Sequence, residues 1–220
     1  MKTNDLISKF LKGKSVLEKV KSQYNGEIKV EDVWGSGISI RVDGIMQSGK
    51  LVREVWSETL NKFQEINKSI PNKILILGLG GGDLAWMLRK RFPDSKIVGV
   101  DIDLQIVEMG KKYLGLNPDT VEIIIDDAFE FVKKQKKEKQ KFDLVCVDLY
   151  QGTEYPEIFD TDDFYENLKE ISDWSIINRL YYGEKRPKAM KSLSRLEKMF
   201  EKIEVVHPTL KSNIVFVMKS

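Results

Sequence analysis

Short continuous apolar runs that alternate with amphipathic segments constrain this chain more than any other feature. Five such runs follow Pro71: KILIL (73–77), KIVGV (96–100), VEIII (121–125), FDLVCV (142–147) and WSIINRL (174–180). Strands buried on both faces of a parallel sheet have this appearance, and each crossover between them needs a helix-length connection. The pattern predicts an α/β fold with a Rossmann-like, mostly parallel sheet and helices on both faces.

The C-terminal part of the chain ends differently. A helix is expected near 186–200, followed by the alternating stretches KIEVV and SNIVFVM with a turn at Pro208 between them. Two alternating stretches joined by a turn predict a C-terminal antiparallel hairpin.

The N-terminal part has its own pattern. The first 22 residues show helical spacing with a break at Gly13, and residues 56–68 return to helical spacing. Between them, EIKVEDVW, GISIRVDG and KLVREVW alternate apolar and polar residues, which predicts a small antiparallel β-meander. We therefore expect N-terminal helices and a small β-domain over 1–68, and an α/β domain over 69–220.

Composition and charge exclude several classes of protein. Apolar residues make up 41% of the chain, enough for a core, and 36 Lys and Arg against 34 Asp and Glu leave a net charge of +2. That balance predicts no nucleic-acid partner. The lysine-rich run 133–141 lacks interleaved aromatic residues and is interpreted as a solvated helix end. With no membrane-length apolar run and no signal-peptide pattern, we expect a soluble cytoplasmic protein.

Scarce residue types narrow the chemistry. The single cysteine, Cys146, lies in a buried-strand candidate, and the single histidine, His207, precedes the turn at Pro208. We therefore expect no metal site built from cysteine or histidine clusters. Trp34, Trp86 and Trp174 are expected to anchor the core.

Polar residues gather where the predicted parallel strands end. The glycine turn 78–82 follows the first strand, Asp101 the second, the pair Asp126-Asp127 the third and Asp148 the fourth. Ligands of such sheets bind beyond these carboxyl ends. Glycines let a ligand approach the backbone closely, and a carboxylate 23 residues beyond Gly78 can accept ribose hydroxyl protons.

Two ligand classes and one purely structural explanation fit this pattern. A dinucleotide turn would need a small residue at position 83, where Asp83 would repel a pyrophosphate. Acids at three strand ends favour a cationic nucleoside without phosphates, such as S-adenosylmethionine. Alternatively, acids such as Asp83, Asp103 and Asp127 only cap the helices that follow them.

These motifs resemble, in order, those of the spermidine synthase superfamily, the spermidine-synthase-like branch of the class I S-adenosylmethionine-dependent methyltransferase fold. KSQYNGEIKVED and ISIRVDGIMQSG are similar to its N-terminal β-domain, with Asp43, Gly44 and Gln47 in an Asp-Gly-x-x-Gln pattern. KILILGLGGGDLAWML resembles its nucleoside-binding turn. KIVGVDID, IIIDDAFEFV and FDLVCVDLYQG resemble the next strand ends, and FEKIEVVHPTLKSNIVFVM the terminal hairpin.

The resemblance covers roughly residues 20–220 and implies S-adenosylmethionine or its decarboxylated form as the cofactor, with no metal and a homodimeric assembly. It implies that Asp101 holds the ribose, that Asp127 faces the adenine edge and that Gln47 covers the nucleoside. The implied cofactor-binding residues are Gln47, Gly78, Gly80, Gly82, Asp83, Asp101, Asp127 and Ala128.

For the acceptor side, the resemblance implies that Asp148 helps to deprotonate the attacking amine and that the stretch 149–160 shapes the acceptor pocket. Tyr150, Gln151 and Trp56 are the candidate substrate contacts. Two of them depart from the family pattern. Gln151 stands where the polyamine motif has its second Asp, and Trp56-Ser57 replaces a Tyr-His or Tyr-Gln pair, although Glu58 matches. Glu154 and Asp160 remain as further acids for a cationic site.

A third departure lies in the glycine turn. Aminopropyltransferases of this family have an Asp inside the turn, and Gly81 occupies that position here. A glycine there would leave room for the carboxylate of S-adenosylmethionine, so methyl transfer to a small-molecule acceptor is slightly favoured. The alternatives are a polyamine aminopropyltransferase and a non-catalytic nucleoside-binding homologue.

Overall fold

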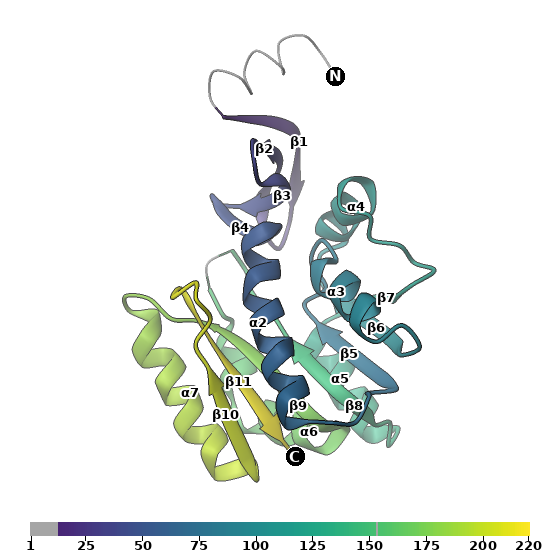
Figure 1. Cartoon of the computed structure of the whole chain (residues 1–220), viewed down its shortest axis with the longest axis vertical. Coiled ribbons are helices and arrows are strands. Elements are labelled where there is room, and N and C mark those ends of the chain that lie inside the picture. The colour runs from purple at the N-terminus through teal and green to yellow at the C-terminus, as the bar shows by residue number, and fades with distance from the viewer. Residues whose placement is uncertain (1–12, 153) are drawn as a thin grey trace.

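The computed structural model describes residues 13–152 and 154–220. It contains a four-stranded sheet and a seven-stranded sheet, joined by one long helix (Figure 1). The small sheet has the order β1-β2-β3-β4, with β1 Lys14–Ser22, β2 Gly26–Val33, β3 Gly37–Val42 and β4 Ile45–Ser48. The connecting helix is α2, Lys50–Ile66.

The large sheet has the order β10-β11-β9-β8-β5-β6-β7. Its parallel strands are β5 Lys73–Leu77, β6 Lys96–Asp101, β7 Glu122–Ile125, β8 Phe142–Val147 and β9 Ser172–Leu180. The hairpin strands β10 Lys202–Val206 and β11 Asn213–Lys219 pair antiparallel, and β11 also pairs antiparallel with β9. The predicted α/β fold, its parallel strands and its terminal hairpin are therefore confirmed.

Helices cover both faces of the large sheet because residues along each strand alternate in direction. Ile74 and Ile76 of β5 pack on the face that is covered by α2, α3 and α4, whereas Leu75 and Leu77 pack on the face covered by α5, α6 and α7. These helices are α3 Asp83–Arg91, α4 Leu104–Tyr113, α5 Ala128–Lys137, α6 Asp162–Ile171 and α7 Lys185–Met199, and the short 3₁₀ helix η1 spans Glu157–Asp160. These four apolar residues of β5 are fully buried, as continuous apolar runs predict.

The N-terminal prediction is wrong in two places. Residues 14–22 form a strand rather than a helix, because β1 pairs along its length with β2 and a bulge at Val16/Glu18 absorbs the irregular spacing. The first expected helix lies outside the described residues. KLVREVW forms the start of α2 rather than a third strand, since Val55, Trp56, Leu60 and Phe63 make one buried helical stripe.

The expected boundary between residues 68 and 69 falls in the loop that joins α2 to β5. The division of the chain into two domains there stays a prediction, as does the homodimer.

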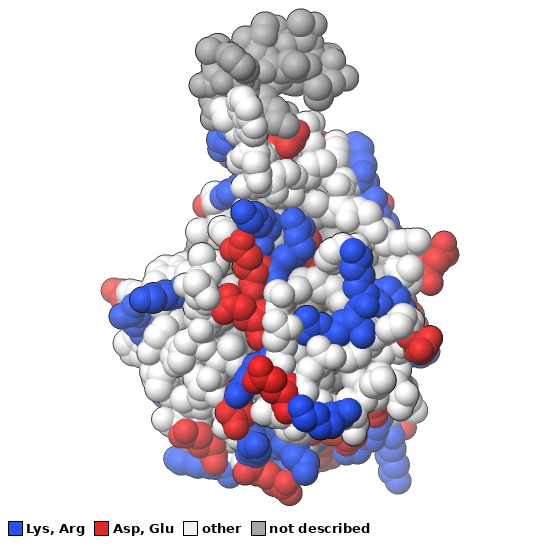
Figure 2. Space-filling view, in the orientation of Figure 1, with Lys and Arg blue, Asp and Glu red and all other residues white. Residues whose placement is uncertain are grey.

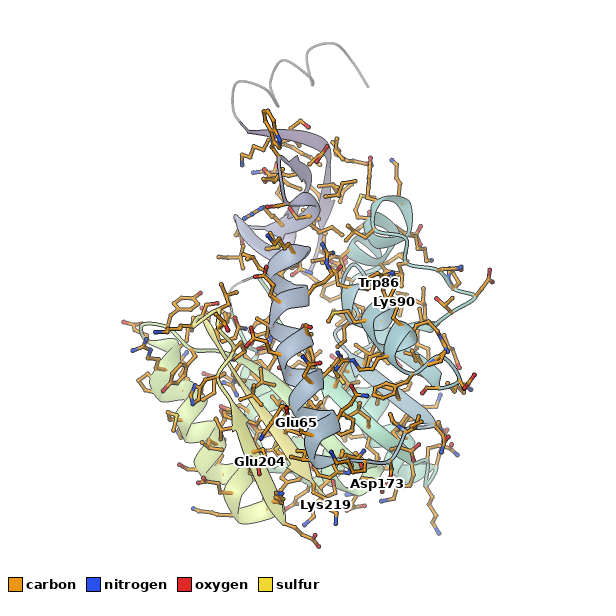
Figure 3. The ribbon with its side chains drawn as sticks, in the orientation of Figure 1. Glu65, Trp86, Lys90, Asp173, Glu204 and Lys219 are labelled. Atoms are coloured by element: carbon orange, nitrogen blue, oxygen red, sulfur yellow. The ribbon has the colours of Figure 1, made fainter. Side chains whose placement is uncertain are left out.

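Two of the three tryptophans that were expected in the core lie at the surface. Trp34 is 65% exposed and Trp86 is 49% exposed. Figure 3 shows Trp86 and Lys90 projecting together from α3, with the Lys90 ammonium 4.0 Å from the centre of the indole ring. Trp174 is partly buried and packs against the core, edge-on to Phe63. The fully buried tryptophan is Trp56.

Charges of both signs are interspersed over the face of the molecule shown in Figure 2. The lysine-rich run ends α5, where Lys133 pairs with Glu130 and Lys136 with Glu170. These pairs agree with a solvated helix end. Among the described residues, no helix is long and apolar enough to cross a membrane.

Gly110 of α4 offers a direct test of how the helix packs on the glycine turn. Gly-to-Ala in a helix interior normally stabilises by about 1 kcal/mol. Here the new methyl group would lie 2.7 Å from the carbonyl oxygen of Gly81, which is rigid backbone. We expect Gly110→Ala to destabilise by roughly 1–3 kcal/mol in chemical denaturation. Glu108→Ala on the exposed face of the same helix should change stability by less than about 0.5 kcal/mol.

Candidate functional site

A cavity of about 500 Å³ opens at the carboxyl edge of the large sheet, between the ends of its parallel strands and the small sheet. That volume suits a nucleoside-sized ligand together with a small second molecule. Among the described residues that line the cavity, the charged ones are Arg41, Asp83, Asp101, Asp127 and Asp148. Four carboxylates against one guanidinium favour a cationic ligand over a polyphosphate.

The glycine turn brings two strand ends into contact. The order of the strands reverses between β5 and β8, and the loops that follow these strands meet there. Gly78 has a φ of +88°, and a Cβ atom at this position would overlap the carbonyl oxygen of Asp148. Glycine is therefore required at position 78 for both conformation and space. Gly78 and Gly80 line the cavity.

Asp101 is held at the end of β6 by the backbone of its neighbours. Its Oδ2 accepts from the Gly80 N–H at 2.7 Å, and its Oδ1 accepts from the Asp103 N–H at 2.9 Å. Burial raises the pKa of the Asp101 carboxyl to about 6, although these backbone donors oppose the change. Each carboxylate oxygen has a further lone pair, so the side chain can still accept two ribose hydroxyl protons.

Asp127 and Ala128 begin α5 at the end of β7 and line the cavity. The Oδ1 of Asp127 caps the helix, accepting from the N–H groups of Phe129 at 2.8 Å and Glu130 at 3.0 Å. Both capping bonds use the same oxygen, which leaves Oδ2 for an exocyclic amine. Helix capping and ligand binding are therefore compatible at Asp127.

Asp148 is a half-buried carboxylate that is held by neutral donors. The indole Nε1–H of Trp56 donates to its Oδ2 at 2.8 Å, and the amide of Asn178 donates to its Oδ1 at 2.9 Å. Burial raises the pKa of the Asp148 carboxyl, and the two hydrogen bonds oppose that shift. Asn178 is itself oriented by Asn213, whose amide donates to its Oδ1. A carboxylate that is held in one orientation and has a raised pKa can serve as a proton acceptor.

The structure changes the interpretation of Gly81. Its Cα faces the small sheet and α4 rather than the cavity, and a Cβ atom there would lie 2.6 Å from Ser48 Oγ and 2.7 Å from Leu114 Cδ1. Glycine at this position is thus explained by packing, and the expectation that it makes room for a cofactor carboxylate is wrong. Gly82 likewise faces Leu116 and does not line the cavity.

Asp83 lines the cavity, but its carboxylate is already engaged. It accepts from Arg53 Nη1 at 2.5 Å and from the Gly49 N–H at 2.5 Å. Burial raises the pKa of Asp83 despite the neighbouring guanidinium. The side chain thus links the start of α3, which packs on the large sheet, to the start of α2, which directly follows the small sheet.

The small sheet covers the cavity through hydrogen bonds to the loop after β8. The Gln47 amide donates to the Gly152 carbonyl at 2.9 Å, and the Gln151 amide donates to the Tyr24 carbonyl at 2.8 Å. The Gly81 N–H also donates to Ser48 Oγ at 2.8 Å. Gln47 and Gln151 both line the cavity, and the contact of Gln47 with a nucleoside stays a prediction.

Tyr150 lines the cavity, and its hydroxyl donates to the Asn178 carbonyl at 2.9 Å. Of the other acids expected in a cationic site, none lines the cavity. Glu154 pairs with Lys185, and Asp160 pairs with Arg179 at 3.4 Å. Glu58, which matches the family pattern, is half-buried and accepts from the N–H of Thr209.

Sequence reasoning missed Asn178 and Arg53, which donate hydrogen bonds to the site carboxylates Asp148 and Asp83. Asn178 lies near the carboxyl end of the fifth parallel strand, so the rule that found the acids would have found it if applied to amides. Arg53 pairs with Asp83 across 30 positions of the chain, and no local pattern indicates that. Among residues 13–152 and 154–220, no group of three or more His, Cys, Asp or Glu could hold a metal ion.

The chain is similar to several known proteins. It is 30% identical over 173 residues to the polyamine aminopropyltransferase of Sulfurisphaera tokodaii, which covers 74% of this chain and 56% of that protein. It is 32% identical over 100 residues, 45% of this chain and 15% of the other, to an "eEF1A lysine and N-terminal methyltransferase homolog" of Drosophila pseudoobscura pseudoobscura. The chain spans about half the length of the first polyamine aminopropyltransferases it matches.

Solved structures agree on the fold. The spermidine synthase of Thermotoga maritima superposes with a TM-score of 0.73 at 20% identity, covering 93% of this chain and 72% of that one. Human methyltransferase-like protein 13 in complex with SAH superposes with a TM-score of 0.63 at 20% identity, covering 76% and 79%. The model of the spermine/spermidine synthase domain matches residues 53–177, more than half of the chain. The chain therefore belongs to the spermine/spermidine synthase family.

Proposed function

We propose that this protein is a transferase that moves the aminopropyl group of decarboxylated S-adenosylmethionine onto an amine. The observation that supports this most directly is one cavity into which the glycine turn, Asp101 and the half-buried Asp148 all converge. The family match supports it, as do the curated relatives, among which polyamine aminopropyltransferases are prominent.

The donor fits the half of the cavity formed by the first three strand ends. The turn at Gly78 and Gly80 presents backbone without side chains, Asp101 accepts from the ribose hydroxyls, and Asp127 Oδ2 accepts from the adenine amine. The donor has a sulfonium cation and no phosphate, in keeping with the mainly acidic lining. Gln47 and the hairpin at Tyr24 cover the bound nucleoside from the small sheet.

Asp148 accepts the proton in the transfer step. The lone pair of the acceptor amine attacks the propyl carbon attached to sulfur, forming a C–N bond as the C–S bond breaks. The sulfur keeps the bonding pair and leaves as neutral methylthioadenosine, and the proton released by the nitrogen goes to the Asp148 carboxylate. Trp56 and Asn178 hold that carboxylate in one orientation, so alignment supplies much of the rate enhancement.

Methyl transfer is the second candidate. The comparisons back aminopropyl transfer better, and packing at Gly81 removes the sequence argument that favoured methyl transfer. A specific observation keeps the candidate in view: the similarity over 100 residues to proteins named as methyltransferases. Ordinary S-adenosylmethionine would then be the donor and S-adenosylhomocysteine the product.

Mass spectrometry of the small molecules released from each donor tests the proposal. We expect methylthioadenosine and an aminopropylated amine from the decarboxylated donor. Release of S-adenosylhomocysteine from S-adenosylmethionine alone would show methyl transfer instead. Binding of both donors without any product would point to the non-catalytic homologue.

Replacing Asp148 by asparagine removes the proton acceptor but keeps the side-chain shape. We expect Asp148→Asn to lower kcat by about 10²–10⁴-fold. Calorimetric affinity for methylthioadenosine should stay close to that of the parent protein. Asp94→Asn, in an exposed loop, is the matched control and should leave both quantities unchanged. Full activity in the Asp148 variant would remove this residue from the mechanism.

The hydrogen bond from Trp56 predicts a shift in the pH profile. Its indole stabilises the ionised Asp148, so Trp56→Phe should raise the pKa of that carboxyl further. A base works only when ionised, so the acidic limb of kcat/KM against pH should move to higher pH. The exposed Trp86→Phe should leave the profile in place. An unchanged limb in Trp56→Phe would contradict the assignment of Asp148 as the base.

Asp101 predicts a pH dependence of nucleoside binding. With a pKa of about 6, the free carboxyl is mostly ionised at pH 8 and mostly protonated at pH 5. Only the ionised form accepts both ribose protons, so methylthioadenosine should bind about tenfold more weakly at pH 5 than at pH 8. Asp101→Asn should bind weakly with no such step. Calorimetry at both pH values measures this, and a pH-independent affinity in the parent protein would be inconsistent with the ribose contact.

A further inference from the structure

We infer that the acceptor is an amine with a single positive charge on an apolar body, rather than a polyamine. This inference rests on the proposed function and names its second substrate. It comes from the acceptor half of the cavity, defined as the lining around Asp148 formed by Trp56, Tyr150, Asn178, Leu180, Tyr182 and Leu210.

The acceptor half contains one charged group. Asp148 is its carboxylate, and the residues around it supply indole, phenol, amide and aliphatic surface. The other charged residues that line the cavity lie elsewhere: Asp83, Asp101 and Asp127 at the first three strand ends and Arg41 on the small sheet. One ammonium can therefore be paired here, and the remainder of the acceptor must contact neutral side chains.

Nearby acids cannot serve a second ammonium without breaking existing pairs. Glu154 is bound to Lys185, and Asp160 is bound to Arg179 and to the hydroxyl of Tyr165. Neither acid lines the cavity. Glu154 and Asp160, which the sequence suggested as partners for a polyamine, therefore bind cations and a hydroxyl of the protein itself.

Fixed positive charges also lie just beyond the acceptor half. A small recess on the far side of Tyr150 and Leu180 is lined by Arg179, Lys185 and Lys188, together with one carboxylate, Glu154, which pairs with Lys185. The guanidinium of Arg179 lies 3.9 Å from the centre of the Tyr155 ring and is almost fully buried. A second ammonium that extended past Tyr150 would approach a recess in which three cations outnumber one carboxylate, and this net positive charge raises its free energy.

Two amines of equal size test the inference. Hexylamine and 1,5-diaminopentane have the same number of non-hydrogen atoms, and they differ in whether the far end is a methyl or an ammonium group. Burying an unpaired ammonium is costly, so with decarboxylated S-adenosylmethionine we expect kcat/KM for hexylamine to be higher by on the order of 10–100-fold. Methylthioadenosine release, followed by chromatography, measures both.

The outcomes separate the inference from the function on which it rests. Equal or better use of the diamine would overturn the inference and leave aminopropyl transfer standing. No methylthioadenosine from either amine, or from spermidine, would overturn the proposed function and the inference with it.

A matched pair of variants tests the physical cause. Leu210 lies in the loop between β10 and β11, where a polar side chain is tolerated more readily than in a strand. Leu210→Glu adds a second carboxylate to the acceptor half, and Leu210→Gln adds the same shape without charge. We expect the preference for hexylamine over the diamine to fall at least fivefold in the Glu variant relative to the Gln variant. Equal preferences in the two variants would show that charge does not select the acceptor, contrary to the inference.

Discussion

The contact between the glycine turn and the loop after β8 is the constraint on which the site depends. At the point where strand order reverses, the backbone of Gly78 lies against the carbonyl of Asp148 so closely that no side chain fits between them. This contact places the glycine turn beside the proposed proton acceptor. In the proposed reaction, a donor held by the turn would present its reactive carbon to Asp148.

The small sheet completes the site through polar contacts with the edge of the large one. Ser48 accepts from the glycine turn, Asp83 bridges to the start of α2, and Gln47 bonds to the loop after β8. These contacts come from residues that the sequence separates by up to 105 positions. The small sheet, which is separate from the large parallel sheet, therefore closes the cavity.

Neutral hydrogen-bond donors, rather than a cation, stabilise the ionised form of Asp148. An arginine or lysine at this place would hold the carboxylate ionised but would repel a protonated amine. Trp56 and Asn178 orient it without adding positive charge, and burial keeps its pKa raised. Trp56-Ser57 stands where the family pattern has a Tyr-His or Tyr-Gln pair. The indole of Trp56 both positions the acid and adds apolar surface to the proposed acceptor half.

The sequence by itself determined the parallel strands, their order along the chain and the acids that end them, because burial on both faces leaves a continuous apolar signature and strand ends lie at one edge. It misled at β1, where pairing with β2 overrides helical spacing, and at the start of α2, where a buried helical stripe overrides short alternation. Only the tertiary structure showed that Gly81 faces the small sheet and that Asn178 donates a hydrogen bond to Asp148. It also showed that Glu154 and Asp160 form ion pairs with Lys185 and Arg179. Those facts depend on tertiary contacts between side chains that are far apart in the sequence, and residue spacing does not predict such contacts.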